Sequence, residues 1–416
     1  MSSVPRRRDR TRILVWICVL IAINQLGFGA VVAVLALYAR SFGVSQSAIG
    51  LAIAVYGFAR FVVAMPAGRL ADRAGRRAGL ALGGLVTGGG NLICALAPTY
   101  AIFIAGRFVA GAGAALVLIT GTVILADITT PADRGRTMAI YQGVFLFAVG
   151  IGPMPGGILA ERFGLVAPFF VYTVAGLLAG ALAWIVIPET RRDGVDAEGI
   201  AALPAFGAQV RHLTTHTGFV LVSLVSFVAA FARTGALFNV IPVVARERLG
   251  LGAEQIGLGL GLASVVGLVL IYPSGMLVDR YGRKIVIMPA TLVSGAAMLL
   301  FLVMPGYAWF LAGCVVWSVA TGVSGAAPAA YAADTAPSGM NAAAMSAYRM
   351  LADLGYVIGP LALGAITDAF GAGAALATAT VLLVAAAGLF GWRAPETVYM
   401  GAPKWPPSPP RSGRPG

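Results

Sequence analysis

The chain has 416 residues, of which 59% are hydrophobic and only 11% are charged. About a quarter of the residues of a soluble protein are charged, so this chain is too poor in charge to cover two or three soluble domains. Its net charge of +13 would suggest a nucleic-acid partner in a soluble protein. The positions of the charges, described below, exclude that interpretation.

Apolar stretches recur along the whole chain, most of them near the roughly 20 residues that a helix needs to cross a bilayer. They predict an all-α integral membrane protein with 12 transmembrane helices. The expected helices cover residues 14–37, 48–67, 79–97, 101–126, 137–159, 166–187, 219–243, 255–274, 285–304, 308–333, 342–366 and 373–392.

Lysine and arginine are distributed very unevenly between the two sets of loops. If the N-terminus is inside, 21 of the 29 lie on the cytoplasmic side, four on the outer side and four within apolar segments. Positive charge favours the cytoplasmic side of a membrane, so both termini should be cytoplasmic and the protein should lie in the cell membrane. The first apolar stretch is too long for a signal peptide and is expected to remain as a helix.

The sequence is one six-helix unit written twice. A shift of 207 residues matches Asp72 with Asp279, Gly152-Pro153 with Gly359-Pro360, and residues 188–190 with 395–397, both Pro-Glu-Thr. Because each copy has an even number of helices, we expect parallel repeats about an axis along the membrane normal, with a substrate cavity between them. The expected organisation is a basic cytoplasmic tail (1–12), a first bundle (13–190), a cytoplasmic linker (191–218), a second bundle (219–397) and a Pro-rich cytoplasmic tail (398–416).

A ten-residue loop follows the second helix and recurs after the eighth. It reads GRLADRAGRR at 68–77 and GMLVDRYGRK at 275–284. Glycine permits tight turns, and an acid can accept hydrogen bonds from a helix N-terminus. The duplicated loop resembles the most characteristic motif of the major facilitator superfamily, whose fold is the one predicted above.

The resemblance implies a cytoplasmic latch between the halves, in which the loop acid contacts the opposite half. It also implies that the arginine four residues later pairs with an acid at the end of the fourth helix of the same half. The residues to which these roles fall are Gly68, Asp72, Arg73, Gly75, Arg76 and Asp127, and in the second half Gly275, Asp279, Arg280, Gly282, Arg283 and Asp334. The alternative is that these charges only specify topology, although topology alone requires arginine but no positioned acid.

The fifth helix carries a Gly/Pro motif that resembles the one associated with antiporters of the family, drug–proton exchangers in particular. Proline removes a backbone donor and bends a helix, and glycine permits close packing. We expect Gly156 and Gly157 to let this helix approach the eighth, which offers Gly257, Gly259 and Gly261. The residues of the motif and its copy are Gly143, Gly152, Pro153, Gly156, Gly157, Gly359 and Pro360.

Polar side chains inside apolar helices, at positions where the two halves differ, are candidates for the substrate or coupling pathway. Arg107, in an RFVAGAGAA stretch that resembles the family's Arg-bearing fourth-helix motif, is the first; its alternative is a side chain that extends to the outer interface. Ordinary interhelical hydrogen bonding is the alternative for the others. The set is Asn24, Gln25, Arg60, Asn91, Arg107, Gln142, Arg233, Asn239, Arg349 and Asp353.

Asp353 is the only acid well inside an expected helix, one turn from Arg349. It could carry a coupling proton or balance a cationic cargo, or it could only pair with Arg349. Many relatives that exchange drugs for protons have an acid in the first helix, where this chain has only Asn24 and Gln25.

The sequence therefore predicts a secondary active transporter rather than an enzyme, most readily one that exports a drug-like, amphipathic compound in exchange for protons. The alternatives are a transporter of an organic anion or another metabolite, because four interior arginines face one interior acid, and a non-transporting receptor with the same fold. We expect a monomer in the lipid bilayer, with a small-molecule substrate and without cofactor, metal or nucleic acid. His212 and His216 stand four apart without an acid or cysteine to complete a metal site.

Overall fold

The computed structural model describes residues 7–129, 134–190, 211–325, 327–336 and 341–397. All regular structure in these ranges is helical, and an α-helix satisfies its own backbone groups in lipid. Twelve helical spans among the described residues are long and apolar enough to cross a membrane. This is the number that the sequence predicts.

The helices fall into two groups that follow one another along the chain. The N-terminal group consists of α1 (Arg7–Arg40), α2 (Gln46–Ala74), α3 (Arg76–Ala95), α4 (Tyr100–Ile128), α5 (Arg134–Ile151), α6 (Pro153–Phe163) and α7 (Ala167–Val186). The C-terminal group consists of α9 (Thr217–Ala232), the π-helix η2 (Arg233–Val240), α10 (Ile241–Leu249), α11 (Ala253–Tyr281), α12 (Arg283–Val303), α13 (Tyr307–Ser324), α14 (Ala327–Asp334), α15 (Asn341–Phe370) and α16 (Ala372–Arg393).

Three of the expected membrane helices are interrupted. The fifth breaks at Gly152, between α5 and α6, because Pro153 and Pro155 both lack the N–H that would continue the helix. Its copy, α15, has the single Pro360 and runs on through it. The seventh contains η2, which ends two residues before Pro242. The tenth ends its first part at Gly325, whose φ is 45°, three residues before Pro328.

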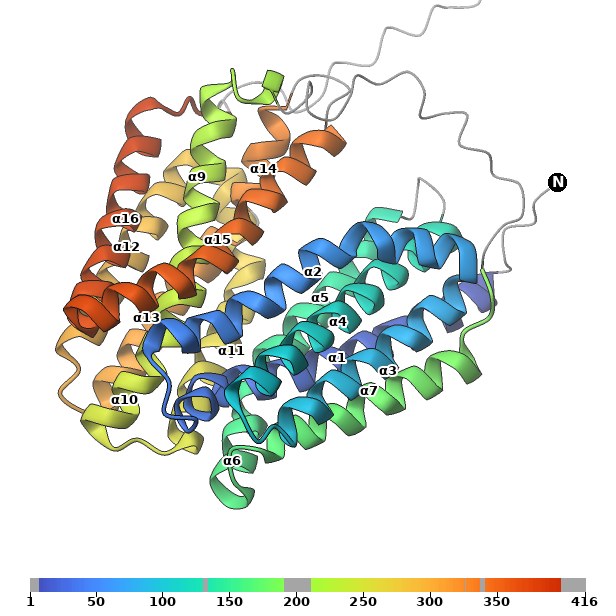
Figure 1. Ribbon diagram of the computed structural model, residues 1–416. Helices are drawn as coiled ribbons and strands as arrows, with labels where there is room; N and C mark the ends of the chain where they lie inside the picture. The colour runs from blue at the N-terminus through green and yellow to red at the C-terminus, as the bar shows by residue number, and fades with distance from the viewer. Residues whose placement is uncertain (1–6, 130–133, 191–210, 326, 337–340, 398–416) are drawn as a thin grey trace, which may run out of the picture.

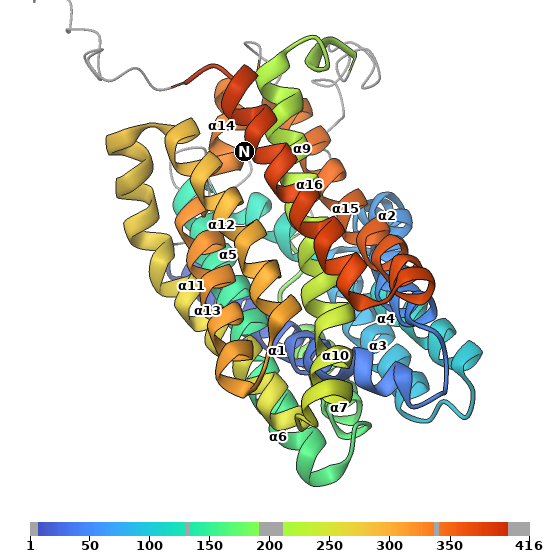
Figure 2. The same ribbon diagram turned by 90° about the vertical axis from the view of Figure 1, so that its left-hand side faces the viewer.

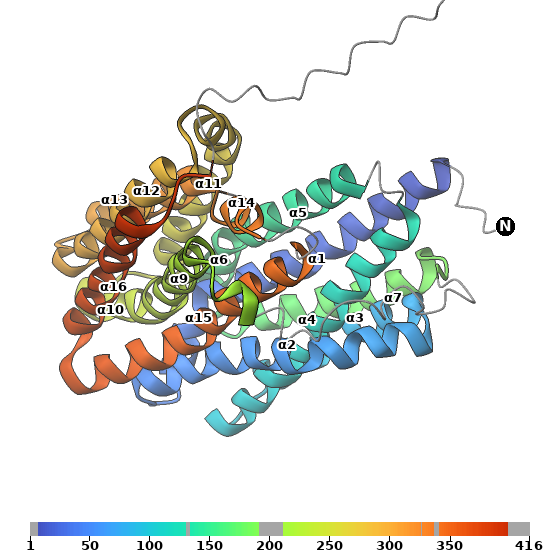
Figure 3. The ribbon, with the colours of Figure 1, turned by 90° about the horizontal axis from the view of Figure 1, so that it is seen from above.

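In the part of the chain that the structure describes, the two groups lie against each other toward one end. We call the end that carries residues 40–46, 164–167, 250–252 and 370–372 the distal end, and the opposite end, where α1 begins and α16 ends, the proximal end. In Figure 1 the proximal end of the C-terminal group points up and that of the N-terminal group points to the right, so the proximal ends diverge. In Figure 2 the C-terminal group lies in front of the N-terminal group, and in Figure 3 the two groups lie side by side.

Packing agrees with this arrangement. Between the groups, α2 packs against α15, and α5 and α6 pack against α11. The largest cluster of buried apolar side chains joins Ile49 and Ile53 of α2 to Ile241 of α10 and Ile256 of α11. A second cluster, with Ile13, Leu80 and Ile124, belongs to the N-terminal group alone. The distal core is therefore shared by the groups, whereas this second core is not.

Candidate functional site: the proximal loops, the group interface and the polar interior

The duplicated loop forms the turns between α2 and α3 and between α11 and α12. Gly75 and Gly282 adopt φ values of 96° and 92°, a region that side-chain-bearing residues rarely enter. Arg76 Nε lies 3.1 Å from an oxygen of Asp127, and Arg283 pairs with Asp334. Both ion pairs that the family resemblance implies are thus present, each between the start of one helix and the end of another within a group.

Three further residues of the duplicated loops are exposed or stand in open space. Arg73 and Arg280 are exposed, and no described atom lies within 4 Å of the position that a side chain on Gly275 would take. The side chains of Asp72 and Asp279, together with the surroundings of Gly68, lie outside the described residues. The latch between the groups therefore remains a prediction.

Two acids that sequence reasoning missed complete these loops. Glu189 accepts hydrogen bonds from the backbone N–H of Arg76 at 2.8 Å and of Arg77 at 3.3 Å. Glu396 does the same for Arg283 and Lys284, both at 3.0 Å. Each carboxylate caps a helix N-terminus, where the helix dipole favours negative charge. The repeated Pro-Glu-Thr triplet is the sequence signal that could have identified them.

The glycine motif of the fifth helix contacts two different partners. A side chain on Gly157 would come within 2.5 Å of the Ala253 carbonyl and 3.0 Å of Gly257 in α11, in the other group. A side chain on Gly156 would instead meet the backbone of Ala30 in α1, in the same group. Gly152 also packs against α1, whereas a side chain on Gly143 would have no described atom of another segment within 4 Å.

The expectation that Gly156 and Gly157 both serve the contact with the eighth helix is therefore wrong for Gly156. Successive helical residues point about 100° apart, so the two glycines face neighbouring helices. On the partner helix, Gly257 and Gly261 face α6, while Gly259 faces the ring of Phe310. Residues 257 and 261 share a helix face and residue 259 does not.

Arg107 is buried in the N-terminal group, with 1% of its surface exposed. Its Nε donates to the carbonyl of Ala52 in α2 at 3.1 Å, and its guanidinium lies 4.5 Å from the centre of the Tyr56 ring. One of its terminal nitrogens is buried without a partner in the described structure. The alternative in which Arg107 extends to the membrane surface does not hold, because the side chain points into the protein.

Charged groups from both groups of helices converge on Tyr356. The charges of Arg60, Arg107 and Arg233 all act on its phenol group, and a side chain on Gly57 of α2 would lie 2.7 Å from its ring. Tyr356 therefore lies where α15 faces the N-terminal group. These three arginines and Tyr356 come from α2, α4, η2 and α15.

Arg349 and Asp353 lie on the same face of α15 as Tyr356, since residues four and three apart are neighbours on a helix surface. The two charged groups are 3.7 Å apart, and their side chains are 63% and 46% exposed. Both interact electrostatically with Arg233, whose side chain is exposed between buried neighbours. Arg233 begins the π-helix η2, a distortion that often occurs at functional sites.

The other polar candidates differ in burial and in their hydrogen-bond partners. Asn24 is fully buried in α1 and neither of its side-chain polar atoms has a partner in the described structure; Gln25, beside it, is also buried. Gln142 of α5 is exposed. Asn91 donates to Thr87 of its own helix at 2.8 Å, although its side-chain oxygen is buried without a partner in the described structure. Among the contacts described, α3 packs only on helices of its own group, which favours a packing role for this residue.

Asn239 joins the two groups at the distal end. The Gln46 side-chain amide of α2 donates to its side-chain oxygen at 2.9 Å. Its own amide donates to the Pro360 carbonyl of α15 at 3.0 Å. The Pro360 carbonyl also lies against Gly50 of α2. The Gly359-Pro360 copy of the motif is thereby placed at the contact of α2, η2 and α15.

Two helical groups that lie together toward one end and contain twelve apolar spans among the described residues define the fold of a multi-pass membrane protein. The sequence model of the Major Facilitator Superfamily matches residues 17–234 and 222–413 of this chain. The chain belongs to this family.

Relatives and solved structures agree with the family. The chain is 24% identical over 84% of its length to an uncharacterized MFS-type transporter of Methanocaldococcus jannaschii, covering 89% of that protein. It is 26% identical over 66% of its length to multidrug resistance protein 2 of Bacillus subtilis, covering 68% of it. Among solved structures, a bacterial homologue of the human lysosomal transporter Spinster, inward-facing and unoccupied, has a TM-score of 0.78 at 16% identity, with 93% of this chain and 97% of that chain covered.

Proposed function

We propose that the chain is a secondary active transporter that exports a small amphipathic, drug-like compound in exchange for protons. The observation that carries the proposal is the set of ionisable groups on the face of α15 that is turned toward the N-terminal group. Asp353 and Arg349 lie there with Arg233 beside them. Ionisable groups inside a membrane protein typically belong to ion or substrate pathways. The name of the Bacillus subtilis relative supports a drug-like cargo.

We further propose that the proximal end is cytoplasmic, because most of the lysine and arginine of the loops lies there. The diverging proximal ends would then make this the inward-facing state of two parallel repeats. The contact of Gly157 with α11 supports the antiporter assignment, since it is the close approach that the fifth-helix motif is expected to serve. In this account the protein acts as a monomer in the cell membrane.

Dye efflux from cells tests the proposal. Cells that express the chain and are loaded with ethidium should lose the dye faster than cells that express Asp353→Asn. A protonophore should remove the difference, because it collapses the proton gradient without touching the protein. Equal efflux with and without the chain, for ethidium and for several chemically distinct amphipathic dyes, would contradict drug export.

An organic anion is the second candidate cargo, and the charge balance of the interior favours it. Arg60, Arg107 and Arg233 act on one tyrosine, and the acid near them, Asp353, already pairs with Arg349. Arginine suits carboxylate and phosphate because its planar fork can bind two oxygens at once. Export of carboxyfluorescein but not of ethidium would favour this candidate over the first.

A further inference from the structure

The distal end carries two acidic caps that join the groups and are copies of one another. Glu161, near the end of α6, accepts a hydrogen bond at 2.7 Å from the backbone N–H of Ala253, the first residue of α11. Asp368, near the end of α15, accepts hydrogen bonds at 2.8 Å from the backbone N–H groups of Gln46 and Ser47, the first residues of α2. Residue 368 is the copy of 161, and residue 253 is the copy of 46, at the shift of 207.

A single ion pair completes the arrangement. Arg40, at the end of α1, contacts Glu247 of α10 through Nε at 3.0 Å and through a terminal nitrogen at 2.8 Å. These residues are also 207 apart, so each is the copy of the other. A residue meets its own copy only where a two-fold axis passes between the two. The ion pair therefore marks the axis, and the two caps lie on either side of it.

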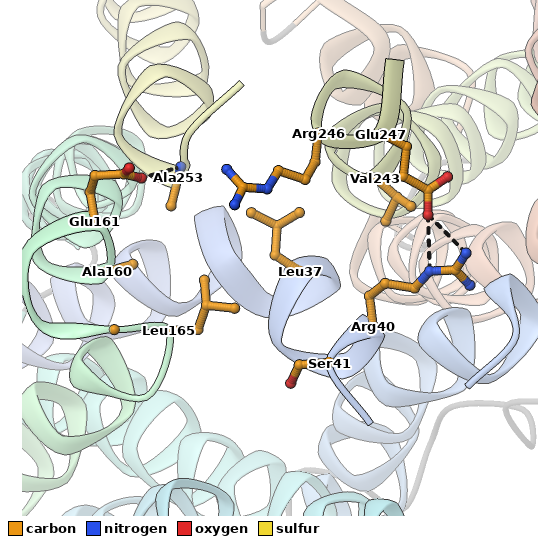
Figure 4. Close-up of a pocket in the computed structure, with 11 residues that line it drawn as sticks. Leu37, Arg40, Ser41, Ala160, Glu161, Leu165, Val243, Arg246, Glu247 and Ala253 are labelled. Carbon is orange, nitrogen blue, oxygen red and sulfur yellow. Dashed lines mark hydrogen bonds and ion pairs between the residues drawn. The ribbon is translucent and has the colours of Figure 1, made fainter. Parts of the chain in front are cut away.

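The ion pair lies at the edge of a pocket between the two groups. A pocket of about 380 Å³ at the distal end is lined by residues of both groups, among them Leu37, Glu161 and Arg246. Figure 4 shows Arg40 paired with Glu247 on one side of this pocket and Glu161 bound to Ala253 on the other. Arg246 donates to the carbonyl of Leu251 in its own group at 3.1 Å. Around this pocket, the polar contacts described between the groups are therefore the ion pair and the Glu161 cap. The Asp368 cap and the Gln46–Asn239 hydrogen bond also join the groups at the distal end.

We propose that Glu161, Asp368 and the Arg40–Glu247 pair form a distal gate that holds the present state and must open once in every transport cycle. Each contact joins two groups that have to separate at this end if the protein works by alternating access, and the inference rests on that part of the proposed function. A carboxylate at a helix N-terminus is favourable only while the helix end is close. The gate thus favours the state whose distal end is closed and is absent from the opposite state.

Spin-label distances across the distal end test the gate directly. Phe163 and Phe370 are 74% and 78% exposed and belong to opposite groups, so cysteines at these positions can carry labels after Cys18, Cys94 and Cys314 are replaced by alanine. In lipid nanodiscs, Glu161→Gln and Asp368→Asn should each raise the population of longer distances roughly twofold to fivefold, and the double variant more. Glu254→Gln, which removes an acid from the first turn of the same α11, should leave the distribution unchanged.

Charge exchange at the axis gives the second readout. Arg40→Glu and Glu247→Arg should each lengthen the distances, because like charges then face each other, and the double exchange should restore the original distribution. A double exchange that does not restore it, or cap variants with the original distribution, would overturn the gate. Distances that respond as expected in a protein that does not move the proposed cargo would leave the gate in place and overturn only the proposed cargo or its coupling.

Discussion

At the scale of single residues, the main question is whether Asp353 carries a proton or only pairs with Arg349. Their charged groups lie 3.7 Å apart, and both side chains remain accessible. An acid that carries a coupling proton must be able to lose its partner and reach water, and this accessibility suits that role. We expect Asp353→Asn to lower proton-driven export at least about tenfold while downhill exchange of the cargo continues. The measurement is export against exchange in the same vesicles.

The rival interpretation makes a different forecast for the double variant. If Asp353 only partners Arg349, replacing both should restore transport, since no unpaired charge is left in the protein. We expect Arg349→Gln with Asp353→Asn to remain without proton-driven export. Restored, gradient-dependent export in that variant would remove Asp353 from the coupling mechanism.

The loop acids Asp72 and Asp279 are the second set of single residues with a predicted role. Their positions next to turns that hold the Arg76–Asp127 and Arg283–Asp334 pairs support the latch between the groups. We expect Asp72→Asn and Asp279→Asn to slow transport severalfold without changing the amount of protein in the membrane, and the two effects need not be equal. Glu254→Gln, which changes an acid in the first turn of α11 at the opposite end of the molecule, is the matched control. Transport at the original rate in both variants and in their combination would refute the latch.

At the scale of helices, variants of the glycines of the fifth-helix motif can distinguish an effect on folding from an effect on conformational change. Gly157 faces α11 of the other group and Gly156 faces α1 of its own. We expect Gly157→Leu to insert and fold but to abolish transport, because the distal ends can no longer close. Gly156→Leu should lower the yield of folded protein, because α1 and α6 never separate. Gly143→Leu should be tolerated, since a side chain there would have no described atom of another segment within 4 Å.

Three measurements check these glycine variants together: the amount of monodisperse protein, dye efflux, and cross-linking of a cysteine pair placed on α6 and α11. The pair should cross-link in the parent protein and fail to do so in Gly157→Leu. Normal efflux in Gly157→Leu would show that the close approach of α6 and α11 is not needed.

The position of each helix could be predicted where hydrophobic length or a proline pair determines it. It could not be predicted where contacts with neighbouring helices determine the local geometry. Length and hydrophobicity predict the twelve spans, and two closely spaced prolines predict a bend where the structure has the break at Gly152. The π-helix at Arg233–Val240 stands just before Pro242, whereas α15 remains continuous through Pro360 although its copy breaks, so a single proline does not decide whether a helix is distorted. A helix tolerates one missing N–H when a neighbour satisfies the freed carbonyl four residues earlier. The Thr234 hydroxyl does this at 3.2 Å for the carbonyl of Tyr356, and such help is invisible in a single sequence.

The candidate site was predictable to a similar extent. Both arginine–aspartate pairs of the loops follow from a motif, and Arg107 follows from its position inside an apolar helix. Glu161 and Asp368 were missed because acids near helix ends carry no signal by themselves. Their partners are backbone N–H groups of the other half, and that contact exists only in one relative position of the groups. Sequence periodicity describes each group but does not describe how the two are placed.

At the scale of the whole molecule, two groups of helices share a distal core and diverge at their proximal ends. For a member of the Major Facilitator Superfamily, this arrangement supports a cycle in which the distal end opens as the proximal end closes. The caps and the ion pair at the distal end and the predicted latch at the proximal end would then favour opposite states. Weakening one should have the same effect on the populations as strengthening the other.

The most direct test of proton-driven transport uses the purified protein in liposomes with a fluorescent amphipathic dye and an imposed pH gradient. We expect dye to move up its concentration gradient toward the more acidic side, with protons moving the other way, and to stop when a protonophore is added or when Asp353 is replaced by Asn. Dye movement at the same rate without a pH gradient, or in the Asp353→Asn protein with one, would contradict proton-coupled export.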